Sequence, residues 1–187
     1  MTRLFAGKVV VQAAMSLDGF IAGPDDSMDW VFQYTTPDEF PEIVQATGAM
    51  LSGRRSYDVG QRDAGKPSGE AYGGAWQGPS FVLTHNPPAD TGVTFLSGDI
   101  EAAVATGKAA AGAKNLVVVG ADVAAQCLQR DLVDEILVVV LPVLLGAGTH
   151  FYSSAAGRRI DLEPVRCSQS GSVQLMQFNV LKHDAGD

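Results

Sequence analysis

The stretch Leu116–Phe151 constrains the fold of this chain more than any other part of its sequence. Leu116–Val119 is a short, apolar, β-branched run of the kind that forms a strand buried on both faces. Gly120 ends that run, and apolar residues then recur at near-helical spacing through Ala121–Arg130. Ile136–Leu141 has the composition of a second buried strand. A strand, a glycine turn, a helix and a strand make a βαβ unit, which places the turn and the helix N-terminus where phosphate groups bind.

The length and composition favour one globular α/β domain. The chain has 187 residues, of which 46% are hydrophobic and 18% charged. A net charge of −8 disfavours nucleic-acid binding through a general basic field. Cys127 and Cys167 make no disulfide framework, and Cys127 falls on the apolar face of the predicted helix, as a buried free thiol does. No clustered Cys/His pattern predicts a metal site, and no run predicts a membrane span or a leader, so we expect a cytoplasmic protein without a metal.

The other expected elements surround this unit. Val9–Ala14 predicts a central strand, and the long loop that follows, from Ser16 to Ser27, is of a kind that often acts as a lid. A helix is expected to begin after Thr36, because Thr36, Pro37 and Glu39 form a capping-box pattern. The glycine-rich segment 60–78 is predicted to be a mobile loop anchored by Trp76. Further strands are expected at Ala49–Leu51, Ser80–Leu83, Val93–Leu96 and Val173–Leu181, the last antiparallel to its neighbour. Further helices are expected to begin at Arg54 and to span Ile100–Ala111.

One segment between a predicted strand and a predicted helix has the composition of an anion site. Gly53–Ser56 brings two guanidinium groups and a hydroxyl to a helix start, where the dipole and backbone N–H groups also favour negative charge. A solvated arginine pair explains the same residues about equally well. Thr84 and His85, at the end of another strand, are suited to a phosphate or a ribose, although a turn before Pro87 explains them too.

Spacing alone leaves more than one role for two further groups of residues. Gly120, Ala121 and Asp122 open the helix of the βαβ unit and suit a pyrophosphate, but they also fit a plain βα turn. They do not form GxGxxG, so a Rossmann-type dehydrogenase is disfavoured. The candidate acids near the first loop are Asp18, Asp29 and Glu39. Most such carboxylates are solvated or cap helices, and Glu39 in particular suits the capping box.

Six stretches in the same order resemble the dihydrofolate reductase-like superfamily. The closer resemblance is to the reductase domain of bacterial bifunctional riboflavin deaminase–reductases, here as a stand-alone chain. The six stretches are AAMSLDGFIA (Ala13–Ala22), MDW (Met28–Trp30), MLSGRRSYD (Met50–Asp58), FVLTH (Phe81–His85), VVVGADVAAQCL (Val117–Leu128) and LVDEILVVVLPVLLGAGTHFY (Leu132–Tyr152). The resemblance implies a three-layer α/β fold with a mostly parallel central sheet and an antiparallel C-terminal edge.

The resemblance also implies NADPH as cofactor and assigns roles to residues of this sequence. The implied cofactor-binding residues are Ala14, Ile21, Gly53, Arg54, Arg55, Ser56, Thr84, His85, Gly120, Ala121, Asp122, Val123 and Ala124. The implied substrate-binding residues are Met28, Trp30 and Thr149, and the implied catalytic acids are Asp29 and Glu39, with Thr149 supporting the carboxylate of Glu39.

The activity that we expect is hydride transfer from NADPH to a small heterocycle of the pterin or pyrimidine class. One alternative is reduction of 5-amino-6-(5-phosphoribosylamino)uracil, although the chain lacks the long basic segment that such reductases carry after the SLDG loop. An alternative of another class is a nucleotide-binding module without catalysis. We also expect a homodimer, because the apolar run Ile136–Leu145 exceeds what one core of this size needs.

Overall fold

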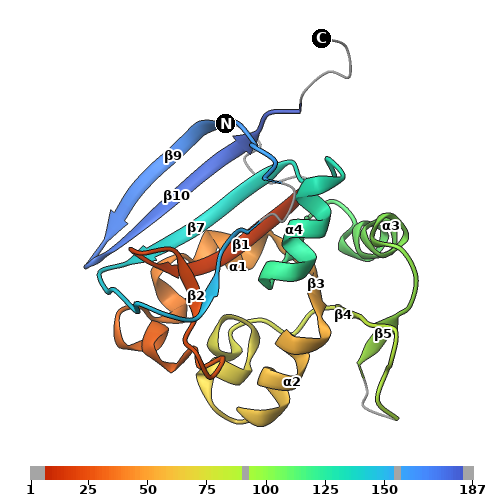
Figure 1. The fold of residues 1–187 in the computed structure, drawn as a ribbon, viewed down its shortest axis with the longest axis horizontal. Coiled ribbons are helices and arrows are strands. Elements are labelled where there is room, and N and C mark those ends of the chain that lie inside the picture. The colour runs from red at the N-terminus through yellow and green to blue at the C-terminus, as the bar shows by residue number, and fades with distance from the viewer. Residues whose placement is uncertain (1–6, 90–92, 154–156, 183–187) are drawn as a thin grey trace.

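The computed structural model describes residues 7–89, 93–153 and 157–182, and within them it contains an eight-stranded sheet with helices on both faces (Figure 1). The strand order is β5-β4-β3-β6-β1-β7-β10-β9. Neighbouring strands from β5 to β7 run parallel, whereas β10 is antiparallel to both β7 and β9. This arrangement confirms the predicted sheet. The strands are β1 (Val9–Ser16), β3 (Thr47–Gly53), β4 (Ser80–Leu83), β5 (Thr94–Leu96), β6 (Asn115–Val118), β7 (Glu135–Leu141), β9 (Leu162–Ser170) and β10 (Val173–Val180).

The helices divide the core into layers on the two faces of this sheet. Alternate residues of β1 face opposite ways, so Val9 and Val11 pack with α3 and α4, whereas Val10 packs with Ile43 of α1. Figure 1 shows α3 and α4 together on one face and α1 on the other. The α-helices are α1 (Pro41–Ala46), α2 (Arg54–Arg62), α3 (Ile100–Ala111) and α4 (Ala121–Gln129), and short 3₁₀ helices span Asp29–Gln33, Pro37–Glu39, Pro67–Gly69 and Ala71–Gly74.

The predicted βαβ unit is present as β6, α4 and β7, with β1 lying between its two strands. Gly120 forms the turn before α4 with φ +89° and ψ 135°, a conformation that only glycine adopts at little cost. Cys127 lies fully buried on the inner face of α4, as predicted. Its burial raises the pKa of the thiol to about 12, so the group is neutral at physiological pH.

Three expectations about loops and helices need correction. The loop 16–27 is not wholly irregular, because Phe20–Ala22 forms a strand, β2, that pairs antiparallel with β8 (Thr149–His150). The helix expected after Thr36 is interrupted at Phe40. Proline disfavours helical dihedral angles in the residue that precedes it, and Pro41 begins a second helix. The segment 60–78 contains two 3₁₀ helices, and Trp76 anchors it as expected by donating to the Thr47 carbonyl oxygen at 3.2 Å.

Other boundaries were predicted more closely, with one omission. The strand at Ser80–Leu83 and the helix at Ile100–Ala111 are found with the expected bounds, and the Asp99 carboxylate accepts from Ala102 N at 2.7 Å as its cap. Strand β9 was not predicted from the sequence.

Within the part of the chain that the structure describes, no helix is long and apolar enough to cross a membrane.

Candidate active site

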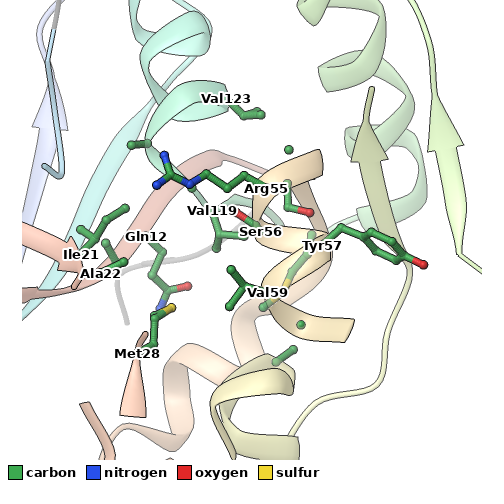
Figure 2. A pocket seen from close by; sticks show the side chains of 18 of the residues that line it. Gln12, Ile21, Ala22, Met28, Arg55, Ser56, Tyr57, Val59, Val119 and Val123 are labelled. Carbon is green, nitrogen blue, oxygen red and sulfur yellow. The ribbon is translucent and has the colours of Figure 1, made fainter. Parts of the chain in front are cut away.

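A large cavity of about 1410 Å³ opens at the carboxyl ends of the parallel strands. Its lining comes from β1, from the ends of β3 and β4, from the turn between β6 and α4, and from the segment between β2 and α1. Figure 2 shows Gln12, Ile21 and Met28 on one side of this space and Ser56, Tyr57 and Val59 of α2 on the other. The location is the one that an open α/β sheet reserves for ligands.

Two helices begin side by side at one end of the cavity. The N-caps of α2 and α4 are Gly53 and Gly120, and neither helix has a side-chain cap that occupies its first N–H groups. A Cβ at Gly120 would lie 2.6 Å from Ser56 Oγ, and one at Gly53 would lie 3.0 Å from Val123 Cγ2. The two glycines therefore allow the turns to approach closely. Free N–H groups at two neighbouring helix starts form a favourable site for phosphate groups.

Arg54 connects the start of α2 with the loop after β4. Its Nε donates to Asp58 at 2.7 Å, and its Nη1 donates to the Asn86 carbonyl oxygen, also at 2.7 Å. Asn86 N in turn donates to Thr84 Oγ1 at 3.2 Å. Arg54, Thr84 and the adjacent His85 all line the cavity, so this end brings a cation, a hydroxyl and an imidazole together.

Arg55 connects α2 with the loop that follows β2. Its guanidinium forms a bidentate ion pair with Asp26, with Nε 2.9 Å from Asp26 Oδ2, and this hydrogen bonding raises the pKa of Arg55 above its usual value. Arg62 of the same helix donates to the Asp25 carbonyl oxygen at 2.9 Å. The two arginines hold the loop against α2 at the mouth of the cavity.

The opposite end of the cavity is mostly apolar. Its lining includes Met28, Val31, Phe40, Ile43 and Val139. Gln12 of β1 and Tyr72 are polar residues of the lining, and the Tyr72 hydroxyl donates to Gln12 Oε1 at 2.6 Å. A largely apolar space with a few polar groups suits a small heterocycle.

The structure brings most of the sequence-predicted residues to this cavity. The predicted residues that line it are Ala14, Ile21, Met28, Gly53, Arg54, Arg55, Ser56, Thr84, His85, Gly120, Ala121, Asp122, Val123 and Thr149. Asp122, which would repel a phosphate, accepts from Gln126 Nε2 of the same helix at 3.2 Å. Ala124 does not line the cavity, because it points into the core and is 3% exposed.

The two expected catalytic acids do not line the cavity, and neither does Trp30. Glu39 accepts from the Thr35 hydroxyl and, at 3.4 Å, from Thr36 N, so its carboxylate serves the helix start rather than Thr149. Asp29 accepts from Ser68 Oγ at 2.6 Å. The Trp30 indole donates to the Ser27 carbonyl oxygen at 3.1 Å.

Asp18, the third candidate acid, has a structural role. Its carboxylate accepts from Ser16 Oγ at 2.6 Å and from the backbone N–H groups of Leu145 and Gly146. The Ser16 hydrogen bond is the main cause that lowers the pKa of Asp18 below its ordinary value. The SLDG turn is thereby fixed to the turn before β8, and it supports the cavity from outside.

Comparison with known families agrees with this geometry. A family model described as the RibD C-terminal domain matches residues 7–176. The chain belongs to the RibD C-terminal domain family. It is also 29% identical, over 75% of its length and 80% of the relative, to the uncharacterized protein YwjB of Bacillus subtilis.

Solved structures share the fold of this RibD C-terminal domain. A riboflavin biosynthesis protein from Shewanella sp. PV-4 aligns with a TM-score of 0.76 at 22% identity, covering 94% of this chain and 99% of that one. A deaminase/5-amino-6-(5-phosphoribosylamino)uracil reductase from Thermotoga maritima aligns at 0.67 and 17% identity, covering 93% and 56%. Dihydrofolate reductase from Enterococcus faecalis, complexed with NADP(H), aligns at 0.62 and 14% identity, covering 96% and 100%.

Sequence reasoning missed Gln12, Tyr72 and Asp26 as parts of this site. Gln12 carried a usable signal, because it is the one polar residue in the apolar run Val9–Ala14. Tyr72 lies in the glycine-rich segment, and Asp26 lies in the loop after β2. No spacing rule connects either of them to its partner on another element.

Proposed function

We propose that this protein is an NADPH-dependent reductase of a small heterocycle of the pyrimidine or pterin class. The observation that carries the proposal is the continuity of the cavity, which joins an anion-binding end at two helix starts to an apolar compartment. A cofactor with phosphates at one end and a reactive ring at the other fits such a shape. Membership of the RibD C-terminal domain family supports the same class of enzyme.

The residues present fit the phosphate groups of NADPH. The N-termini of α2 and α4 have no side-chain cap and lie next to each other, since Gly120 approaches Ser56 closely, and Arg54 and Arg55 supply positive charge on an otherwise acidic chain. In this assignment Arg54, with Thr84, holds the additional phosphate that distinguishes NADPH from NADH. When bound, the nicotinamide would supply a hydride, and the protein's part is to orient the two rings and exclude water.

The walls of the apolar compartment would hold the acceptor ring against the nicotinamide. Met28, Ile43 and Val139 provide apolar contact, and the β1 backbone passes along the floor. Because Asp29 and Glu39 have hydrogen-bond partners elsewhere, we assign neither of them the delivery of a proton. Solvent at the open mouth of the cavity is the simplest proton source.

5-Amino-6-(5-phosphoribosylamino)uracil is the first substrate to assay, because a reductase named for it shares this fold and the family is that of its C-terminal domain. Dihydrofolate and dihydropterins form the second group. The assay follows the loss of NADPH absorbance after each compound is added. Consumption with one of them supports the proposal. Tight NADPH binding without consumption by any compound favours instead the nucleotide-binding module.

A further inference from the structure

Positive charge in the cavity is confined to one end. Among the described residues that line it, Arg54 and Arg55 are the only arginines, and none is a lysine. Both arginines lie in the first turn of α2, beside the N-terminus of α4. Figure 2 shows the Arg55 guanidinium well apart from Met28, which lines the apolar compartment. A cofactor whose phosphates occupy the two helix starts therefore takes up both arginines of the lining.

Three further cations, on elements that border the compartment, are paired with acids. Asp63, which is 5% exposed, lies 3.0 Å from Arg62 and 3.3 Å from Lys66. The Arg62 hydrogen bond is the main cause that lowers the pKa of Asp63, so its carboxylate stays charged at neutral pH and holds both cations. Arg166 of β9 pairs with Glu42 of α1 at 2.9 Å. A ligand of the compartment would have to break an ion pair to recruit any of the three.

The border of the compartment carries negative charge instead. Glu70 is exposed and lines the cavity, and Asp29 accepts from the hydroxyl of Ser68, another lining residue, at 2.6 Å. The lining also contains His85 and His150, but imidazole side chains are ordinarily neutral at pH 8. A phosphate monoester carries nearly two negative charges at that pH, and a charge that leaves water without a cationic partner is costly. The compartment is therefore suited to a ring that bears no phosphate.

We propose that the acceptor reduced in this cavity is an unphosphorylated heterocycle, a free base or a nucleoside of the pyrimidine or pterin class. The charge of the lining selects it, because the cations bind the cofactor and the apolar compartment admits an uncharged ring. The inference rests on the proposed function in that a cofactor with phosphates occupies the helix starts. It narrows the substrate class of that site by making any phosphorylated acceptor a poor ligand.

Two matched pairs of compounds test this directly. One pair is 5-amino-6-(5-phosphoribosylamino)uracil and the nucleoside that a phosphatase makes from it, and the other is dihydroneopterin 3′-phosphate and dihydroneopterin. Calorimetric titration at pH 8 uses the whole chain saturated with NADP⁺, which fills the cofactor end and cannot deliver a hydride. We expect an unphosphorylated compound to bind at least about tenfold more tightly than its phosphate, because the phosphate gives up water without gaining a cation. Without cofactor, Arg54 and Arg55 are open to the phosphorylated compounds, so this preference should shrink.

Charge reversal in the lining should weaken the preference in a defined way. Glu70→Lys places a cation at the border of the compartment. It should tighten binding of the phosphorylated compound by about 1.4- to 5-fold, the range for an exposed ion pair, and leave its unphosphorylated partner unchanged. Glu163→Lys makes the same change in net charge on β9, outside the cavity lining, and should leave both affinities as in the wild-type protein. An unchanged circular dichroism spectrum identifies variants that are folded.

Three results would overturn the proposal. These are a phosphorylated compound of either pair that binds the cofactor-loaded protein as tightly as its partner does, no binding of any of the four compounds, or equal effects of Glu70→Lys and Glu163→Lys. Failure of the proposed function would look different, because the preference would then appear but NADPH would not be consumed with any heterocycle. Conversely, faster NADPH consumption with a phosphorylated compound than with its partner would retain the reductase and contradict this inference alone.

Discussion

The ion pair between Asp26 and Arg55 leads to two substitutions with opposite expected effects on NADPH affinity. If Arg55 contacts a cofactor phosphate, that contact competes with Asp26 for the same guanidinium. Arg55→Ala should therefore weaken NADPH binding, and Asp26→Asn, which keeps the shape but removes the charge, should strengthen it. If the ion pair only held the loop in place, both substitutions would instead lower the affinity for NADPH.

The magnitudes follow from the exposure of the pair. The Arg55 side chain is 67% exposed and that of Asp26 is 26% exposed, so solvent screens their attraction to about 0.2–1 kcal/mol. Freeing Arg55 should tighten NADPH by about 1.4- to 5-fold. A charge-assisted hydrogen bond to phosphate contributes about 1.5–3 kcal/mol, and subtracting the ion pair leaves about 0.5–3 kcal/mol. Arg55→Ala should then weaken NADPH binding by about 2- to 100-fold.

The assay is a fluorescence titration of NADPH against both variants and the wild-type protein at low and high ionic strength. Because the gain and the loss are electrostatic, both should shrink as salt is added. The reasoning would be refuted if Asp26→Asn weakened binding as much as Arg55→Ala does. Equal affinities for all three proteins would show that Arg55 does not contact the cofactor.

Four other predictions concern the rest of the structure. Replacing Arg54 and Arg55 together with Ala should weaken NADPH far more than NADH in parallel titrations, and equal losses would contradict the phosphate assignment. Gly120→Ala should weaken NADPH binding and lower the free energy of unfolding by about 1–3 kcal/mol, because alanine does not tolerate this backbone conformation. Adding Ser56→Ala should relieve the contact between the new Cβ and Ser56 Oγ but not the backbone strain. A double variant with the wild-type urea midpoint would refute the strain argument. Because the pKa of Asp18 is lowered in the folded protein, its carboxylate stabilises the fold above its unfolded-state pKa, and this stabilisation is lost as pH falls through the folded-state pKa. In Asp18→Asn the free energy of unfolding should therefore depend less on pH over that window. An unchanged pH dependence would exclude a stabilising role for the Asp18 carboxylate. Light scattering should give about twice the 19.6 kDa chain mass, whereas a monomer at micromolar concentration would rule out the predicted homodimer.

The regular part of the fold could be predicted because its signals are local. The apolar run and glycine turn at Leu116–Gly120 and the capped helix Ile100–Ala111 each carry their own pattern. Of the two strands at the antiparallel edge, β10 could be predicted, since its residues alternate weakly in polarity. Strand β9 did not stand out because it lies at the sheet edge, where most of its residues are exposed and no apolar alternation is required.

The cavity lining at the two helix starts could be predicted from the sequence, and so could Met28 at the apolar end, but Gln12 and Tyr72 could not. Glycines and arginines at strand–helix junctions are recognisable because one short segment contains the whole signal. The pairing of Gln12 with Tyr72 joins residues 60 positions apart, and that of Arg55 with Asp26 joins residues 29 apart. For Glu39 the same spacing has two interpretations, because the capping-box pattern that predicts a helix start also accounts for its carboxylate.

The most direct test of the account is deuterium transfer from labelled NADPH. NADPH that carries deuterium on the transferable position of its nicotinamide ring is incubated with the protein and 5-amino-6-(5-phosphoribosylamino)uracil, then with the pterin group, and each product is analysed by mass spectrometry. The account predicts one deuterium in a product, formed in proportion to enzyme and reduced in the Gly120→Ala protein. NADPH that binds in the cavity yet transfers no deuterium to any of these compounds would contradict it.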